Sequence, residues 1–283
     1  MVKIIGIIVV IGSILAGFVL SGGSIMALVH PYEVLTIGGA SLGAFLQANS
    51  GSTFKIVFKK SLSMFGHRFT HAYYLDVLKL LYEILNKSRR EGMMSIEGDI
   101  EEPNESPIFS KYPAILKDAR MTAFITDYLR LMSSGNMAPH ELEGLFDMEL
   151  NSTKADLEHP SHAVAKIADG MPAMGIVAAV LGIVITMGLL VEGDTIKIGA
   201  SVGTALVGTF LGILASYGFF APLAASLEHD AKEELNVLES IKATLVASAS
   251  GMPPTVAVEF GRKVLYPAHR PSFIELEQAM RGA

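Results

Sequence analysis

Hydroxyl side chains are the main polar groups in the most apolar stretches of this 283-residue chain. They stand at Thr186, Ser201, Thr204, Thr209, Ser216 and Tyr217. A hydroxyl inside a membrane can line an ion path, or it can bond to the backbone carbonyl one turn back in its own helix. The chain has no cysteine, and its histidines lack the spacing of a metal site. We therefore expect no metal, no cofactor and no catalytic site, so the chain is not expected to be an enzyme.

Charged residues are spaced unevenly along the chain, of which 51% is hydrophobic. Four long runs contain no Asp, Glu, Lys, Arg or His, and they cover residues 4–29, 34–54, 170–191 and 198–227. An α-helix needs roughly 20 apolar residues to cross the hydrocarbon core of a bilayer, and every run meets that length. The sequence therefore predicts an all-α, polytopic membrane protein with four transmembrane helices and no ionisable side chain inside any of them.

These runs divide the chain into four parts. We expect a transmembrane hairpin at 1–54, a helical cytoplasmic domain at 55–169, a second transmembrane hairpin at 170–227, and a helical cytoplasmic extension and tail at 228–283. The final transmembrane helix is expected to continue through Leu227–Ala249 as one long helix.

Basic residues indicate the orientation of the spans. They follow the second and fourth runs at Lys55, Lys59, Lys60, Arg68, Lys232 and Lys242. The link Ser21–Glu33 has no Lys or Arg, and the link Glu192–Lys197 has one Lys against two acids. Because Lys and Arg are enriched on the cytoplasmic side, we expect both termini and the middle domain in the cytoplasm.

Helical periodicity dominates the middle domain. Apolar residues recur every three or four positions in Tyr73–Asn86, Met121–Met132 and Pro139–Leu150. Gly92, Gly135 and Pro160 are expected to interrupt helices. Lysines alternate with apolar residues in Phe54–Phe65, which fits either a helix lying on the membrane surface or a plain connector.

Small residues and prolines mark the last two spans. GxxxG-type pairs occur at Gly199/Gly203, Gly208/Gly212, Gly175/Ala179 and Ala178/Gly182. They let helices approach closely, either within one chain or between copies in a ring. Pro172 is expected in the first turn of the third span, where it costs no hydrogen bond. Pro222 falls late in the fourth span, where it removes a hydrogen bond and creates either a hinge or a tolerated kink.

The absence of charge in the spans also limits the function. Ion paths across membranes usually contain an ionisable side chain at depth, and none of the four runs has one. Either this chain moves no ion, or a partner helix supplies the carboxylate. The net charge of −6 argues against a nucleic-acid partner, which usually needs a basic face.

Seven segments resemble the MotA family, the larger stator subunit of the bacterial flagellar motor. They are Met171–Val180, Leu206–Leu214, Tyr217–Leu223, Lys87–Gly92, Asp127–Leu131, Val258–Lys263 and Pro271–Glu277. The resemblance implies a pentameric ring of this chain around the membrane helices of MotB, which supplies a membrane aspartate and a peptidoglycan anchor. Ion flow past that aspartate would turn the ring and drive the rotor protein FliG. The chain would thus lie in the bacterial inner membrane and serve motility and chemotaxis.

The resemblance also implies roles for individual residues. Arg89 and Glu97 would contact the rotor, with Arg90 as a second arginine at the same place, whereas without the resemblance these residues read as a solvated charge cluster. The residues of the ion path and its coupling would be Pro172, Ala179, Thr209, Tyr217 and Pro222. Sodium-driven relatives carry a hydroxyl residue where Ala179 stands. An alanine removes an oxygen ligand from any site for a bare cation, so we expect proton coupling.

Two other functions fit parts of the sequence. An energiser of the ExbB/TolQ type also surrounds a partner's helices and uses the proton motive force, but such proteins usually have three spans and an outside N-terminus. A non-conducting membrane scaffold would need no ionisable residue in its spans. The fourth span and the charges at Arg89 and Glu97 favour the motor.

Overall fold

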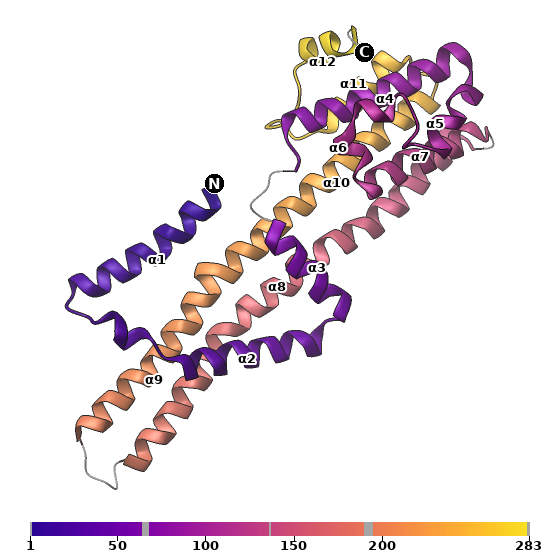
Figure 1. The fold of residues 1–283 in the computed structure, drawn as a ribbon. Helices are drawn as coiled ribbons and strands as arrows, with labels where there is room; N and C mark the ends of the chain where they lie inside the picture. The colour runs from indigo at the N-terminus through magenta and orange to yellow at the C-terminus, as the bar shows by residue number, and fades with distance from the viewer. Residues whose placement is uncertain (1, 64–67, 136, 190–194, 282–283) are drawn as a thin grey trace. The chain divides into compact units, whose positions relative to one another are not determined.

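The computed structural model describes residues 2–63, 68–135, 137–189 and 195–281, and in these ranges it is helical without a strand (Figure 1). The chain forms two compact units. The first, called the membrane unit, comprises Met1–Gly66 and Glu158–His229, and the second, called the globular unit, comprises His67–Leu157 and Asp230–Ala283. Helices α8 (Pro139–Leu189) and α10 (Ala221–Ala249) contribute residues to both.

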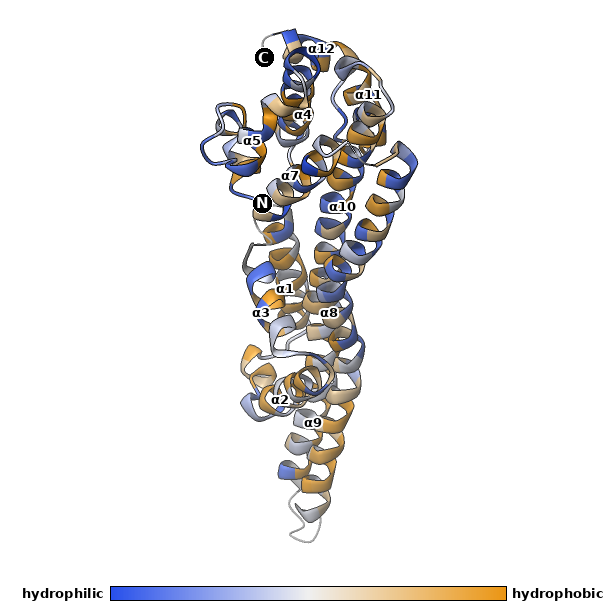
Figure 2. Cartoon of the chain, turned by 90° about the vertical axis from the view of Figure 1, so that its right-hand side faces the viewer, coloured by the Kyte–Doolittle hydropathy of each residue, from blue (hydrophilic) through white to orange (hydrophobic). Residues whose placement is uncertain are grey.

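The membrane unit contains the apolar helices. Its elements are α1 (Val2–Leu20), the short 3₁₀ helix η1 (Ile25–Leu28), α2 (Pro31–Ala48), α3 (Gly51–Ser63), the second part of α8, α9 (Thr195–Ala215), a π-helical turn (Ser216–Phe220) and the start of α10. Four stretches are long and apolar enough to cross a membrane: Lys3–Leu20, Ile25–Ala48, Pro139–Gly188 and Lys197–Ala249. Figure 2 shows the hydrophobic colouring along their apolar parts. The prediction of four transmembrane helices is confirmed.

The first two spans need one correction. Helix α2 begins with Pro31 in its first turn, so Glu33 lies inside the helix and not before it. Proline suits the first turn of a helix, and a carboxylate there is stabilised by the helix dipole. The helix of the second span therefore includes Glu33 in its first turn, whereas the sequence prediction placed Glu33 before the span. The predicted link Glu192–Lys197 falls largely outside the described residues.

Helix α3 confirms part of the prediction for Phe54–Phe65. The helix covers Gly51–Ser63, and residues 64 and 65 lie outside the described residues. Phe54 and Phe58 are one turn apart, and their rings stack with centroids 6.5 Å apart. Lys55 and Lys59 are exposed on the same helix. Its position on a membrane surface stays a prediction.

The globular unit is built around α4 (His71–Glu91), α7 (Ala119–Ser133), the first part of α8 and the second part of α10. Shorter elements complete it: η2 (Met93–Ile96), α5 (Glu97–Glu101), η3 (Phe109–Lys111), α6 (Pro113–Leu116), α11 (Pro254–Val264) and α12 (Phe273–Arg281). The three predicted amphipathic stretches all lie within helices, in α4, α7 and α8. The predicted long helix through Ala249 is also present, as α9, the π-helical turn and α10.

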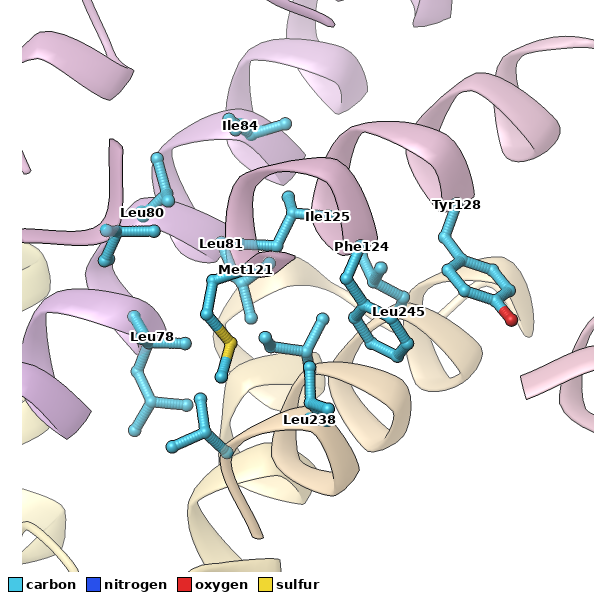
Figure 3. Packing of buried hydrophobic residues seen from close by; sticks show 14 of the residues in the cluster. Leu78, Leu80, Leu81, Ile84, Met121, Phe124, Ile125, Tyr128, Leu238 and Leu245 are labelled. Atoms are coloured by element: carbon cyan, nitrogen blue, oxygen red, sulfur yellow. The ribbon is translucent and has the colours of Figure 1, made fainter. Parts of the chain in front are cut away.

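One hydrophobic core fixes the position of α4 (Figure 3). Leu78 and Leu81 of α4 lie in one cluster with Met121 of α7 and with Leu238 and Leu245 of α10, and all five are fully buried. Each such side chain contributes roughly 1.5–3 kcal/mol on burial. The core therefore holds the end of α4 firmly against α7 and α10.

Glycines end two of these helices as predicted, but a proline does not. Gly92 after α4 has φ +92° and Gly135 after α7 has φ +67°, a backbone region that glycine enters without steric cost. Pro160 was expected to interrupt the chain. Instead α8 runs through both Pro160 and Pro172 without a break.

Candidate functional site

Helices α8 and α9 pack closely in the membrane unit through small residues. A Cβ added at Gly175 would lie 2.9 Å from the Gly208 carbonyl oxygen, and one added at Gly212 would lie 2.8 Å from the Gly175 Cα. Gly182 meets Ala205 in the same way, at 3.0 Å. Only residues without bulk permit this approach. These contacts support packing within one chain for the pairs nearest the middle of the two spans.

The GxxxG pair Gly199/Gly203 behaves differently. A Cβ added at either glycine would meet no described atom within 4 Å. This pair therefore has no close partner in the described part of the chain, so packing between copies stays a prediction for it.

Two of the membrane hydroxyls bond within their own helix. Thr186 Oγ1 donates to the Gly182 carbonyl at 2.8 Å, and Thr204 Oγ1 donates to the Ala200 carbonyl at 3.1 Å. Thr209 lies half-buried where α9 meets α8, yet its hydroxyl has no hydrogen-bond partner among the described residues. The Thr209 hydroxyl is thus available to a water molecule or an ion.

Pro172 lies in the interior of α8, which corrects the prediction that it opens the third span. Because proline has no N–H, the carbonyl four residues earlier loses its helical donor. That carbonyl belongs to Ala168, and the Ser216 hydroxyl donates to it at 2.6 Å. Ser216 is 1% exposed. The hydrogen bond that Pro172 removes from α8 is therefore replaced from the π-helical turn.

The π-helical turn lies immediately before Pro222. In this turn the Ala221 N–H donates to the Ser216 carbonyl, five residues earlier. A proline ring crowds the carbonyl four residues before it, so a wider turn accommodates Pro222. Tyr217, in the same turn, is 70% exposed. The Ser216 side chain thus connects the turn of α8 that contains Pro172 to the π-helical turn before Pro222.

Glu33 reaches the place where α8 and α9 meet. A Cβ added at Gly208 would lie 3.4 Å from the Ala179 nitrogen and 3.5 Å from the Glu33 Cγ. The Glu33 side chain is 11% exposed, and its Oε2 is buried without a hydrogen bond among the described residues. His30 Nδ1 lies 3.9 Å from that oxygen. The structure therefore places the Glu33 side chain against Gly208, which also packs against Ala179 and precedes Thr209 in α9.

A second set of predicted residues lies at the end of α4, in the globular unit. Arg89 and Arg90 are in its last turn, where cations complement the helix dipole, and Glu97 is in the first turn of α5. All three are exposed. None of them makes an ion pair or hydrogen bond with the described part of the chain, and the same holds for Glu91.

Neighbouring charges are paired and hold α5 in place. Lys87 Nζ lies 2.7 Å from Oδ2 of the buried Asp99, and Arg130 Nε donates to Glu101 Oε1 at 2.7 Å. This hydrogen bond lowers the pKa of the Glu101 carboxyl below its ordinary value. The charges that support the fold are thus satisfied, whereas the ones predicted to contact a partner are not.

Comparison with known proteins identifies the family. Residues 4–92 match the family described as Motility protein A N-terminal, and residues 117–240 match the MotA/TolQ/ExbB proton channel family. Motility protein A of Salmonella typhimurium is 45% identical over 283 residues, which cover 100% of this chain and 96% of that protein. The chain belongs to the motility protein A family. Its four apolar spans and this membership make it an integral membrane protein.

Other members of the motility protein A family and two solved structures agree. Chemotaxis protein LafT of Vibrio parahaemolyticus is 35% identical over 279 residues, covering 98% of both chains. A chain in the structure of C. jejuni MotAB matches with a TM-score of 0.77 and 18% identity, covering 94% of this chain and 95% of that one. The flagellar MotAB stator complex from Bacillus subtilis matches with a TM-score of 0.71 and 21% identity, covering 90% and 92%. At sequence identities of 18% and 21%, the structural similarity establishes a shared fold.

The sequence did not predict the helical position of Glu33 or the contact that Ser216 makes. The signal for Glu33 was Pro31, which marks the first turn of a helix and so places Glu33 inside it. No local signal identified Ser216 as the partner of Ala168, because the two residues are 48 positions apart.

Proposed function

We propose that this protein is the MotA-type stator subunit of a bacterial flagellar motor. With MotB it forms an ion channel in the inner membrane, and the complex converts ion flow into torque on FliG. The chain forms a pentameric ring, with both termini and the globular unit in the cytoplasm. The match of residues 4–92 to the motility protein A family supports this function over an ExbB/TolQ-type energiser.

One observation supports the proposed contact with the rotor. Lys87, Asp99 and Arg130 are used in internal ion pairs, whereas Arg89 and Glu97 on the same elements are exposed and unpaired. Exposed charges without internal partners contribute little to the fold, but they steer and orient a charged partner. Arg89 and Glu97 therefore suit a partner that carries both signs of charge.

The ion path runs beside the place where α8 meets α9. The free hydroxyl of Thr209 and the carboxylate of Glu33 belong to this chain, and the titrating aspartate belongs to MotB. Ala179 offers no side-chain oxygen, so the site is poor in ligands for a bare sodium ion, which needs several. A proton needs a titrating carboxylate and a chain of hydroxyls or waters, so the coupling ion is the proton.

Swimming of a bacterium that lacks its own stator genes tests this function. Expression of this chain with its MotB partner should restore swimming, and the speed should survive removal of sodium and collapse with a protonophore. Swimming that collapses without sodium and survives the protonophore would show that the coupling ion is sodium and not the proton. Failure to swim with both proteins present in the membrane would contradict the stator function.

Glu33→Gln should slow the motor several-fold without stopping it. The amide keeps the shape of the side chain but cannot attract a cation toward Thr209, whereas Glu33→Asp keeps the charge and should retain most of the speed. The measurement is proton uptake and motor speed at fixed membrane potential. Glu158→Gln, on α8 of the same unit, is the control. Equal speeds for Glu33→Gln and the unchanged protein would remove Glu33 from the ion path.

A further inference from the structure

A groove opens in the globular unit where α4, α7 and α10 end and α11 begins. Its volume is about 340 Å³. Four methionines line it, Met93, Met132, Met137 and Met252, and Arg89 lines it as well. The groove thus adjoins the proposed rotor contact, and the inference that follows rests on that proposed function.

Three of these methionines lie just after the ends of helices. Each end has a glycine with positive φ, and a methionine follows within two residues: Gly92 and Met93, Gly135 and Met137, Gly251 and Met252. At the end of α10 the Gly251 N–H donates to the Ser248 carbonyl at 2.9 Å, and the Met252 N–H donates to the Ala247 carbonyl at 3.1 Å. At this helix end the pattern reverses the chain and turns Met252 back onto α10.

Methionine suits a surface that must adapt to a partner. Its side chain is unbranched and polarisable, and methionine-rich grooves repack around different apolar groups. Four of the 14 methionines in the chain meet in this one groove. Met93 is half-buried and its sulfur accepts a hydrogen bond from Ser88, whereas Met137 and Met252 are 37% and 41% exposed. The groove therefore combines one hydrogen-bonded methionine with two exposed ones.

The charge of the groove indicates its occupant. Arg89 is the one ionisable residue among the described residues that line it, and its guanidinium has no ion-pair partner in the described part of the chain. A methionine-rich groove that one unpaired cation also lines fits an apolar side chain that has a carboxylate one turn away.

We propose that this methionine groove is the apolar anchor point for the rotor protein. An amphipathic helix of the rotor protein inserts an apolar side chain between Met93, Met137 and Met252, and a carboxylate one turn along the same helix pairs with Arg89. Apolar anchors in pockets carry most of the binding energy of protein interfaces, and charges at the rim set orientation and rate. The groove thus contributes most of the binding energy, while Arg89 and Glu97 set the orientation of the rotor protein.

The test uses the complete complex of this chain with its MotB partner and the purified full-length rotor protein. Met137→Asp and Met252→Asp should each weaken rotor binding by about tenfold, because a charge in the groove excludes the apolar anchor. Met137→Leu and Met252→Leu keep the apolar character and should bind nearly as well as the unchanged chain. Met148→Asp on α8, at a methionine that is 68% exposed outside the groove, is the matched control.

Ionic strength separates the two parts of the interface. The loss of binding in the methionine variants should be the same at low and high salt, whereas the loss in Arg89→Glu should shrink as salt screens the charges. Unchanged binding by Met137→Asp and Met252→Asp, with loss in Arg89→Glu, would overturn the groove as an anchor and leave the rotor contact intact. Unchanged binding by all three variants would overturn the proposed rotor contact itself.

The mass of the assembled complex tests whether a second copy of this chain occupies the groove. The mass of the purified complex should be the same for the methionine variants and the unchanged protein. A complex of lower mass for Met137→Asp or Met252→Asp would mean that the groove holds a second copy of this chain, which contradicts the proposal.

Discussion

Replacement of Ser216 by alanine is expected to lower both the stability of the stator complex and its torque. The Ser216 hydroxyl satisfies the Ala168 carbonyl, whose helical donor is missing because of Pro172. Removing the hydroxyl leaves this carbonyl buried and unpaired, which costs on the order of 1 kcal/mol. The thermal midpoint of the purified complex should fall by a few degrees, roughly 2–4 °C for a chain of this size.

A double-mutant cycle shows whether this cost comes from the proline. In Pro172→Ala, the new amide N–H at position 172 can donate to the Ala168 carbonyl. Ser216→Ala should then cost little, and the two substitutions should couple by about 1 kcal/mol. Thr186→Ala is the control, because the Thr186 hydroxyl bonds only within its own helix. Additive effects of Ser216→Ala and Pro172→Ala would show that the hydroxyl does not replace the missing donor.

Charge reversal at the end of α4 is expected to have the largest effect on torque. Arg89→Glu and Glu97→Lys should each weaken rotor binding by about tenfold at low salt, which corresponds to about 1.4 kcal/mol. Both side chains are exposed and unpaired in the described chain, so the variants should insert into the membrane and assemble normally. The measurement is swimming speed, with the amount of complex in the membrane determined in parallel.

Two further variants sharpen this test. Arg90→Glu asks which arginine carries the contact, and because Arg89 lines the methionine groove and Arg90 does not, Arg89→Glu should impair swimming more. Lys117→Glu reverses another exposed charge of the globular unit and should swim normally. Full motility in an Arg89→Glu, Glu97→Lys double variant would remove both residues from the rotor contact.

Local patterns predicted the elements of this fold well. The four uncharged runs identified four membrane spans, because burial in lipid excludes charge over about 20 residues. The 3.6-residue period identified α4 and α7, because each helix buries one apolar face. Gly92 and Gly135 ended helices because their positive φ angles need a residue without a Cβ.

Tertiary contacts explain what the sequence did not reveal. Glu33 was placed outside the second span because the spans were bounded by charges, yet Pro31 starts the helix before it. Pro172 was expected at a helix start because Asp169 seemed to end the polar domain, yet α8 continues because Ser216 supplies the missing hydrogen bond. The methionine groove is assembled from three helix ends that are far apart in the chain, so no local spacing could predict it.

The speed of a single tethered motor during induction tests the central claim most directly. The host lacks its own stator genes, and this chain and its MotB partner are induced together. Rotation should rise in equal steps as complexes join the motor. It should be absent when this chain is induced alone, or when the partner carries Asn in place of its membrane aspartate. Rotation driven by this chain alone, or with the Asn-containing partner, would contradict an ion path completed by a carboxylate from the partner.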